Sequence, residues 1–289
     1  MELKATEDVE IIVDSGRLLE VVVLALKCSS VGVDLESNGF YHYPEQVCLI
    51  QLAFAGGIYL IDPLSLNDMA AFGQLLDHEG TEKVFHSSAY DIRSLSRDWK
   101  FRVRNLFDTS VAAAFLGSER LGLSSVLEEY LRIKIPKDKK LQRANWTVRP
   151  IHSNLIEYAA SDVKYLVQLA KDLRCKLSVL GRLDWVHEES SRITENVYVT
   201  PHSEFDFLSI KGSHKLDLLS LSVLRSLHKF RENEARRRNR PPFKVLSDAT
   251  LIELSLNPNS DFSEIEGIGL YGKGSSISRG RDIVNDALN

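Results

Sequence analysis

The hydrophobic pattern in the first part of the chain alternates between short apolar runs and segments with helical spacing. Apolar residues three and four positions apart predict a helix that Asp14 or Ser15 caps and that runs to about Lys27. Its expected buried stripe consists of Leu18, Leu19, Val22, Val23 and Leu26. Short apolar runs predict strands at Val31–Glu36, Val47–Phe54, Ile58–Ile61 and Lys83–His86. The glycine pair in Ala55-Gly56-Gly57 predicts that the middle two strands form a hairpin.

Helical spacing dominates the following residues. It predicts helices at Leu66–Leu76, from about Ala89, at Thr109–Leu116, at Ser124–Leu131 and from about Asn154 to Leu180. Strands that cluster early, with helices alternating afterwards, predict an α/β fold in which helices flank a mixed β-sheet. No G-x-G-x-x-G sequence follows a predicted strand, and no Walker sequence is present. These absences argue against a doubly wound nucleotide-binding fold and against a P-loop enzyme.

A change in pattern divides the chain into two domains. The periodicity fades between Gly181 and about Ser213, where Thr200-Pro201-His202-Ser203 is typical of a linker. Two further helices are then predicted, at Leu216–Glu234 and Ser247–Leu256. We therefore expect a first domain at residues 1–190, a linker at 191–213 and a small all-helical domain at 214–289.

Composition narrows the class of protein. The chain has 289 residues with 40 acidic and 36 basic side chains, so its net charge of -4 argues against a uniformly basic nucleic-acid binder but permits local basic patches. Cys28, Cys48 and Cys175 are scattered and include no C-x-x-C pair, which excludes a disulfide framework and a zinc ribbon. No apolar run is long enough to cross a bilayer, and the first residues lack an apolar leader. The expectation is a cytoplasmic protein with no membrane association.

Two carboxylates stand two residues apart on the first predicted strand. Residues i and i+2 of a strand point to the same face, so Asp34 and Glu36 converge while Leu35 faces away. Neighbouring carboxylates repel unless they share a proton or a cation, and Mg²⁺ or Mn²⁺ prefers such oxygen ligands. A solvated strand edge is the competing interpretation of this pair alone.

Three later residues complete a possible site. Asp91 falls in the first turns of a helix that follows a strand, where the helix dipole favours a carboxylate even without a metal. Tyr158 and Asp162 share one face of the long predicted helix. Core packing is the competing role for the tyrosine, whereas a buried aspartate needs a partner. Together the four acids and the tyrosine predict a two-metal site, in which ions about 4 Å apart activate water and stabilise a leaving oxygen.

The same residues carry a family resemblance. The segments Asp34-Leu35-Glu36, His86–Asp91 and Tyr158–Leu166 resemble the three motifs of the ribonuclease D group of DEDD exonucleases, in the branch with a tyrosine in the third motif. The resemblance implies a ribonuclease-H-like exonuclease fold and hydrolysis of RNA from its 3′ end to nucleoside 5′-monophosphates. It also implies two divalent ions, Mg²⁺ or Mn²⁺. By the match of positions, Asp34, Glu36 and Asp162 would hold one ion. Asp34, with Asp91 directly or through water, would hold the second, and Tyr158 would orient the attacking water.

The C-terminal segment resembles the HRDC module, which helicases and ribonuclease D share. The likeness lies in Leu224–Glu232, Pro241–Asp248 and Ile265-Glu266-Gly267. Two basic stretches, Arg132–Arg149 and Leu224–Lys244, are expected to contact phosphates, although basic runs are often only solvated surface. The candidate substrate-binding residues are His86, Lys139, Trp146, Arg149, Arg236, Arg237 and Arg238. Core packing is the alternative role for His86 and Trp146.

The expected function is that of a 3′→5′ exoribonuclease acting on tRNA precursors or other structured RNA with a free 3′ end. Two alternatives remain open at this stage. One is a DNA 3′→5′ exonuclease of the Werner type, because no residue identifies the recognition of a ribose 2′-hydroxyl. The other is a catalytically silent RNA-binding protein, which the complete set of four acids and one tyrosine disfavours. The sequence leaves the oligomeric state and the preferred metal undetermined.

Overall fold

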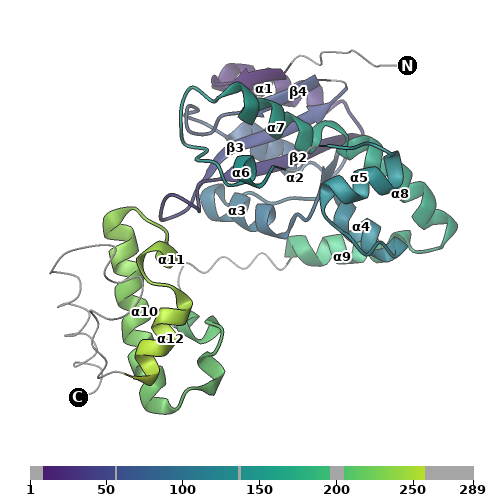
Figure 1. Ribbon diagram of the computed structural model, residues 1–289. Coiled ribbons are helices and arrows are strands. Elements are labelled where there is room, and N and C mark those ends of the chain that lie inside the picture. The colour runs from purple at the N-terminus through teal and green to yellow at the C-terminus, as the bar shows by residue number, and fades with distance from the viewer. Residues whose placement is uncertain (1–8, 56, 136–137, 196–204, 258–289) are drawn as a thin grey trace. The chain divides into compact units, whose positions relative to one another are not determined.

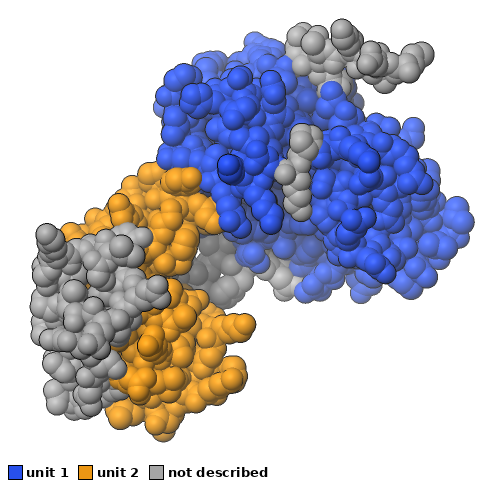
Figure 2. All heavy atoms as spheres, in the orientation of Figure 1, with its two compact units in different colours: residues 1–38, 46–199 blue, residues 39–45, 200–289 orange. Residues whose placement is uncertain are grey.

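The computed structural model describes residues 9–55, 57–135, 138–195 and 205–257 (Figure 1). The chain divides into two compact units (Figure 2). The first unit comprises Met1–Asn38 and Gln46–Val199, and the second comprises Gly39–Glu45 and Thr200–Asn289. Within the described ranges, no helix combines the length and the apolar character that crossing a bilayer requires.

A six-stranded mixed sheet forms the centre of the first unit. Its strands are β1 (Val9–Ile12), β2 (Ser30–Ser37), β3 (Val47–Phe54), β4 (Gly57–Ile61), β5 (Glu82–Phe85) and β6 (Leu106–Asp108), in the spatial order β1-β4-β3-β2-β5-β6. β3 pairs antiparallel with both β2 and β4, and the remaining pairings are parallel. Every residue of β3 is buried, which explains its nearly continuous apolar sequence. The predicted hairpin is therefore confirmed, while the short strands β1 and β6 were not predicted.

Helices cover both faces of this sheet (Figure 1). They are α1 (Ser15–Ala25), α2 (Ala70–Asp77), α3 (Ala89–Trp99), α4 (Thr109–Leu116), α5 (Leu123–Leu131), α6 (Lys139–Gln142), α7 (Ser153–Lys164), α8 (Leu166–Val179) and α9 (Leu183–Glu195). One apolar core lies between the sheet and residues of α1, α2 and α3. The other lies between the opposite face and residues of α4, α5, α7 and α8. The architecture is thus the mixed sheet flanked by helices that the sequence predicts.

Several boundaries differ from the sequence prediction. The helix expected from Asn154 to Leu180 is two helices, because Tyr165 leaves helical geometry with φ -110° and ψ 3°. The stripe predicted for α1 was partly wrong, since Leu19 and Val23 are 51% and 46% exposed. The residues that α1 buries are Leu18, Val21, Val22 and Ala25. α2 begins at Ala70, later than the predicted Leu66.

The second unit is helical in its described part. It contains α10 (Leu218–Arg238), α11 (Pro242–Val245), α12 (Asp248–Leu256) and two short 3-10 helices, Asp206–Ser209 and Ser213–Lys215. The predicted linker at 191–213 is too long at both ends, because α9 continues to Glu195 and Phe207 and Ile210 pack into the core of this unit. Residues 258–289 of the predicted helical domain, including Ile265-Glu266-Gly267, lie outside the described residues.

Candidate active site

Strand β2 presents two carboxylates on the face that α7 and α8 cover. Gly32, Asp34 and Glu36 are every second residue of the strand and therefore all point to this face. A Cβ atom at Gly32 would lie 3.2 Å from both the carbonyl oxygen of Val163 and the Cβ of Leu166. The glycine therefore allows the junction of α7 and α8 to approach the strand closely. This close approach brings the residues of α7 beside Asp34.

Helix α7 supplies the tyrosine and the last aspartate of the site. Its buried face consists of Leu155, Ala159, Ala160 and Val163, whose two alanines fit a close helix–sheet contact. Tyr158 and Asp162 lie one turn apart; burial raises the pKa of the aspartate, and the tyrosine hydroxyl partly offsets that rise. The sequence predicted that these two residues share a helical face, and the structure confirms it.

Asp91 lies on α3, the helix that follows β5. β5 runs parallel to β2, and the turn that follows it leads into α3. Asp91 occupies the first turn of α3 and is only 7% exposed. A carboxylate at a helix N-terminus is favoured by the helix dipole, but such deep burial also requires a compensating partner.

Electrostatic coupling shows that the four acids form one cluster. Burial raises the pKa of Asp34 well above its usual value, and the charge of Asp162 raises it further. Burial raises the pKa of Glu36 in the same way, and so do the charges of Asp34, Asp162 and Asp91. The pKa of Asp91 is raised by burial and by Asp34, and burial raises that of Asp162 to about 7. A site of this kind favours the binding of protons or cations.

The cluster opens into a cavity of about 330 Å³. Its wall is formed by Asp34, Leu35, Glu36, His86, Ser87, Gly122, Leu123, Ser124, Ile135, Asp138, Gln142, Tyr158, Asp162 and Leu166. Asp91 is not part of this wall, in agreement with its burial. The sequence did not identify Ser124 or Gln142 as site residues, because neither belongs to a recognisable motif.

The ligand chemistry of the cluster fits hard divalent cations. All four acids offer carboxylate oxygens, the donors that Mg²⁺ and Mn²⁺ prefer. Among the residues that the structure describes, however, no three of His, Cys, Asp and Glu already form a group arranged to hold an ion. The carboxylates repel one another, and burial raises their pKa values, so a bound cation would compensate the buried charge.

His86 lies in the cavity wall, but both of its ring nitrogens have partners. Nδ1 lies 2.8 Å from the Thr109 hydroxyl, and Nε2 lies 2.7 Å from the Leu121 carbonyl oxygen. Burial lowers the pKa of the imidazole. The ring thus fixes the segment before α5 to the end of β5, and the structure favours this role over the predicted phosphate contact.

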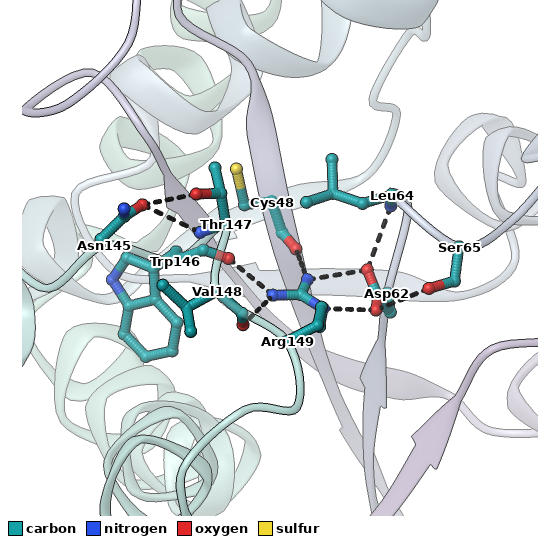
Figure 3. Close-up of polar contacts among 9 residues, drawn as sticks. All are labelled: Cys48, Asp62, Leu64, Ser65, Asn145, Trp146, Thr147, Val148 and Arg149. Atoms are coloured by element: carbon teal, nitrogen blue, oxygen red, sulfur yellow. Dashed lines mark hydrogen bonds and ion pairs between the residues drawn. The ribbon is translucent and has the colours of Figure 1, made fainter.

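Trp146 and Arg149 were predicted to bind substrate, and the structure places both within the protein framework (Figure 3). Trp146 is 1% exposed, and its ring centroid lies 6.2 Å from that of Tyr158. The guanidinium of Arg149 makes two hydrogen bonds to the Asp62 carboxylate, of 2.6 and 2.8 Å. Its remaining contacts are to the carbonyl oxygens of Cys48, Trp146 and Val148. All five N–H donors of the guanidinium are therefore used internally, and none remains for a phosphate.

The other predicted substrate-binding residues differ in whether their side chains already have protein partners. Lys139 begins α6 with an exposed side chain, and its neighbours Asp138 and Gln142 line the cavity. In the second unit, Arg237 and Arg238 both pair with Glu234, and Arg236 lies over the ring of Tyr43. The three arginines therefore have protein partners, whereas the side chain of Lys139 is exposed beside two residues that line the cavity.

Comparison with known proteins agrees with this geometry. Residues 9–178 match the family model described as a 3′-5′ exonuclease, and residues 220–284 match that of the HRDC domain. Ribonuclease D from Desulfotalea psychrophila is 33% identical over 82% of this chain and 64% of its own length. Ribonuclease D from Zymomonas mobilis is 30% identical over 96% of this chain and 72% of its own. The catalytic core of RRP6 from Trypanosoma brucei (mutant C496S) superimposes with a TM-score of 0.81 and 25% identity, covering 100% of this chain and 82% of that one.

A mixed sheet with buried carboxylates on β2, α3 and α7 defines a nuclease of the carboxylate-dependent exonuclease class. The chain belongs to the ribonuclease D family, with a 3′-5′ exonuclease domain followed by an HRDC domain. This assignment confirms the ribonuclease-H-like exonuclease fold and the HRDC resemblance that the sequence suggested. The chain spans about two thirds of the length of the two ribonuclease D relatives described above.

Proposed function

We propose that this chain is a 3′→5′ exoribonuclease that hydrolyses RNA from its free 3′ end and releases nucleoside 5′-monophosphates. The observation that carries the proposal is the convergence of Asp34, Glu36, Asp91 and Asp162 beside a cavity of about 330 Å³. The cavity is of a size that ligand sites commonly have. The family of the relatives supports the same activity.

The four carboxylates would hold two divalent ions, Mg²⁺ or Mn²⁺. Asp34, Glu36 and Asp162 would hold one, and Asp34 with Asp91 the other. Ions bound there would activate a water molecule and stabilise negative charge on the phosphate. The support for this assignment is the electrostatic coupling of the four acids, which disfavours four uncompensated charges in one buried place.

Tyr158 would orient the attacking water through its hydroxyl group. Burial and the charge of Asp162 raise the pKa of this phenol, so it remains protonated at neutral pH and acts as a hydrogen-bond donor. The ring of Trp146 lies beside the phenol, with the two ring centroids 6.2 Å apart. Tyr158 thus positions a nucleophile and is not itself a base in this scheme.

The HRDC-like unit would add affinity for the body of the RNA. Tail helix α10 ends in Arg236, Arg237 and Arg238, whose charges act on a polyanion even where an acid partially neutralises them. Precursors of tRNA or other structured RNA with a free 3′ end are the proposed substrates. A cytoplasmic location stays a prediction from the sequence.

A time course with 5′-labelled single-stranded RNA and matched DNA tests the proposal. Products would shorten from the 3′ end of RNA with Mg²⁺ or Mn²⁺, and both EDTA and the Asp34→Asn change would abolish shortening. Equal degradation of DNA would instead identify a general exonuclease. RNA binding without cleavage under either metal would contradict the proposal and favour a catalytically silent binding protein.

A further inference from the structure

A buried aspartate outside the four-acid cluster has five hydrogen-bond donors around it. Asp108 ends β6, is 1% exposed and caps α4 by accepting the backbone N–H groups of Ser110 and Val111 at 2.8 and 3.3 Å. Capping alone would account for those two bonds. Three further donors come from a different element, the turn between β5 and α3. They are Ser87 N–H at 3.0 Å and the N–H and hydroxyl of Ser88, both at 2.7 Å.

The turn that Asp108 holds has an unfavourable backbone of its own. Ser87 has φ +62°, in the left-handed region that a residue with a Cβ seldom adopts. Ser88 occupies the N-cap position of α3 but makes no side-chain cap bond to that helix, because its hydroxyl donates to Asp108. Residues in such conformations persist where the surrounding structure fixes them, and such residues often lie at functional sites.

Thr109 extends the same attachment by one residue. Its hydroxyl lies 2.9 Å from the Phe85 carbonyl oxygen and 2.8 Å from Nδ1 of His86. Asp108 and Thr109 together therefore bond to four consecutive residues, 85–88, at the end of β5. We name this pair of residues the β6 clamp.

The clamp lies directly before a proposed metal ligand. The Ser88 carbonyl oxygen accepts the N–H of Ile92 in the first turn of α3, and Asp91 belongs to that turn. The position and direction of the first turn therefore depend on Ser87 and Ser88, which Asp108 fixes. Residues that position a metal-binding side chain without touching the metal commonly affect metal affinity as much as activity.

We propose that Asp108 is a positioning residue that holds the start of α3 so that Asp91 reaches the ion that it would share with Asp34. The proposal rests on the metal-dependent function proposed above. Asp108 touches neither substrate nor ion in this scheme, and it acts through the Ser87–Ser88 turn. Disturbing that turn should weaken metal binding in protein that is still folded.

Asp108→Asn tests the proposal because the two carboxylate oxygens have different partners. Oδ1 accepts from Ser87, Ser110 and Val111, whereas Oδ2 accepts both donors of Ser88. An asparagine keeps its oxygen at the three donors and places an NH₂ group against the N–H of Ser88. The change thus preserves the α4 cap and the bond from Ser87, and it disrupts only the bonds from Ser88, the N-cap residue of α3. Ser88→Ala removes one of the same bonds from the other side and serves if Asp108→Asn does not fold.

Asp14→Asn is the matched control. Asp14 caps α1 with one side-chain hydrogen bond, to the N–H of Arg17 at 2.9 Å, and asparagine caps as well as aspartate. Mn²⁺ binding is measured by equilibrium titration below the unfolding temperature of each variant, with Asp34→Asn as the reference for a lost ligand. Hydrogen exchange at residues 87–92 reports the order of the turn.

We expect Asp108→Asn to weaken Mn²⁺ binding about tenfold and to accelerate exchange at 87–92, while Asp14→Asn changes neither. Folded Asp108→Asn and Ser88→Ala proteins that bind Mn²⁺ like the wild type would overturn the inference, whatever their thermal stability. Absence of Mn²⁺ binding in the wild-type chain is a separate result, because it would overturn the proposed metal-dependent function itself.

Discussion

The hydroxyl of Tyr158 lies on the same face of α7 as the carboxylate of Asp162, one turn earlier, and it partly offsets the rise that burial causes in the pKa of that carboxylate. Helix α7 thus holds the proposed water-orienting group and a proposed metal ligand together on one rigid element. Both residues line the cavity of the proposed active site.

Removing this hydroxyl should lower the rate of cleavage while leaving metal binding and folding intact. Tyr158→Phe keeps the ring beside Trp146, so the core is preserved. We expect the single-turnover rate of RNA cleavage to fall about 100-fold or more, as when a positioned proton-transfer or water-orienting group is lost. The control is Tyr130→Phe, whose hydroxyl pairs with Ser118 at 2.8 Å. A Tyr158→Phe enzyme with the wild-type rate would exclude the proposed role.

The stability of the metal-free protein should decrease as pH rises. The pKa of Asp162 is raised from an ordinary 3.8 to about 7, and those of Asp34 and Glu36 are raised by burial and by neighbouring charge. A carboxyl whose pKa is higher in the folded state binds protons more tightly there, so its stabilising contribution is complete below about pH 4 and is lost as pH rises through 7.

Thermal unfolding in EDTA measures this effect. We expect the unfolding temperature to fall as the pH is raised from 5 to 8. Adding Mg²⁺ or Mn²⁺ should raise the unfolding temperature again, most strongly near pH 8, because a ligand that binds only the folded state stabilises that state. Asp34→Asn removes one of the interacting charges and should make the unfolding temperature less dependent on pH. An unfolding temperature independent of both pH and metal would show that the four acids do not interact as described.

The sequence predicted the site more completely than the surroundings of the site. Asp34 and Glu36 were placed by strand alternation, and Tyr158 and Asp162 by helical spacing, because both are local relationships. The break at Tyr165 was missed, since neither glycine nor proline marks it. That junction packs against Gly32, a contact between residues far apart in the chain that the local pattern does not show.

A partner that becomes adjacent only in the folded chain also explains why Arg149 was predicted to contact phosphate. Arg149 lies in a basic stretch, but its partner Asp62 precedes it by 87 residues and becomes adjacent only in the folded chain. The partner of Arg237 and Arg238 is Glu234, which lies within the same helix and could have been inferred from its spacing. The bonds of Asp108 to Ser87 and Ser88 depend on the pairing of β5 with β6, which the local pattern of the sequence does not show.

Replacing Arg149 should therefore reduce stability and leave RNA affinity unchanged. Arg149→Met leaves the carboxylate of Asp62, which is 2% exposed, without its charged partner. Breaking a buried pair from one side typically costs about 3–5 kcal/mol, so we expect a loss of about 3 kcal/mol in the free energy of unfolding by urea. Adding Asp62→Leu should recover part of this loss, because no buried charge then remains. A marked fall in RNA affinity of folded Arg149→Met protein would restore the predicted phosphate contact.

Lys139 should contact RNA, and its loss should appear in the salt dependence of binding. Its side chain is exposed beside two residues that line the cavity, and a phosphate contact there would release counterions. In a catalytically inactive Asp34→Asn background with Mg²⁺ present, we expect Lys139→Ala to weaken RNA binding and to reduce the slope of log affinity against log salt by about 0.7. Lys27→Ala is the control, because Lys27 is an exposed lysine that follows α1 on the opposite face of the sheet. Equal effects of the two changes would indicate general attraction between RNA and positive charge and would remove Lys139 from the substrate path.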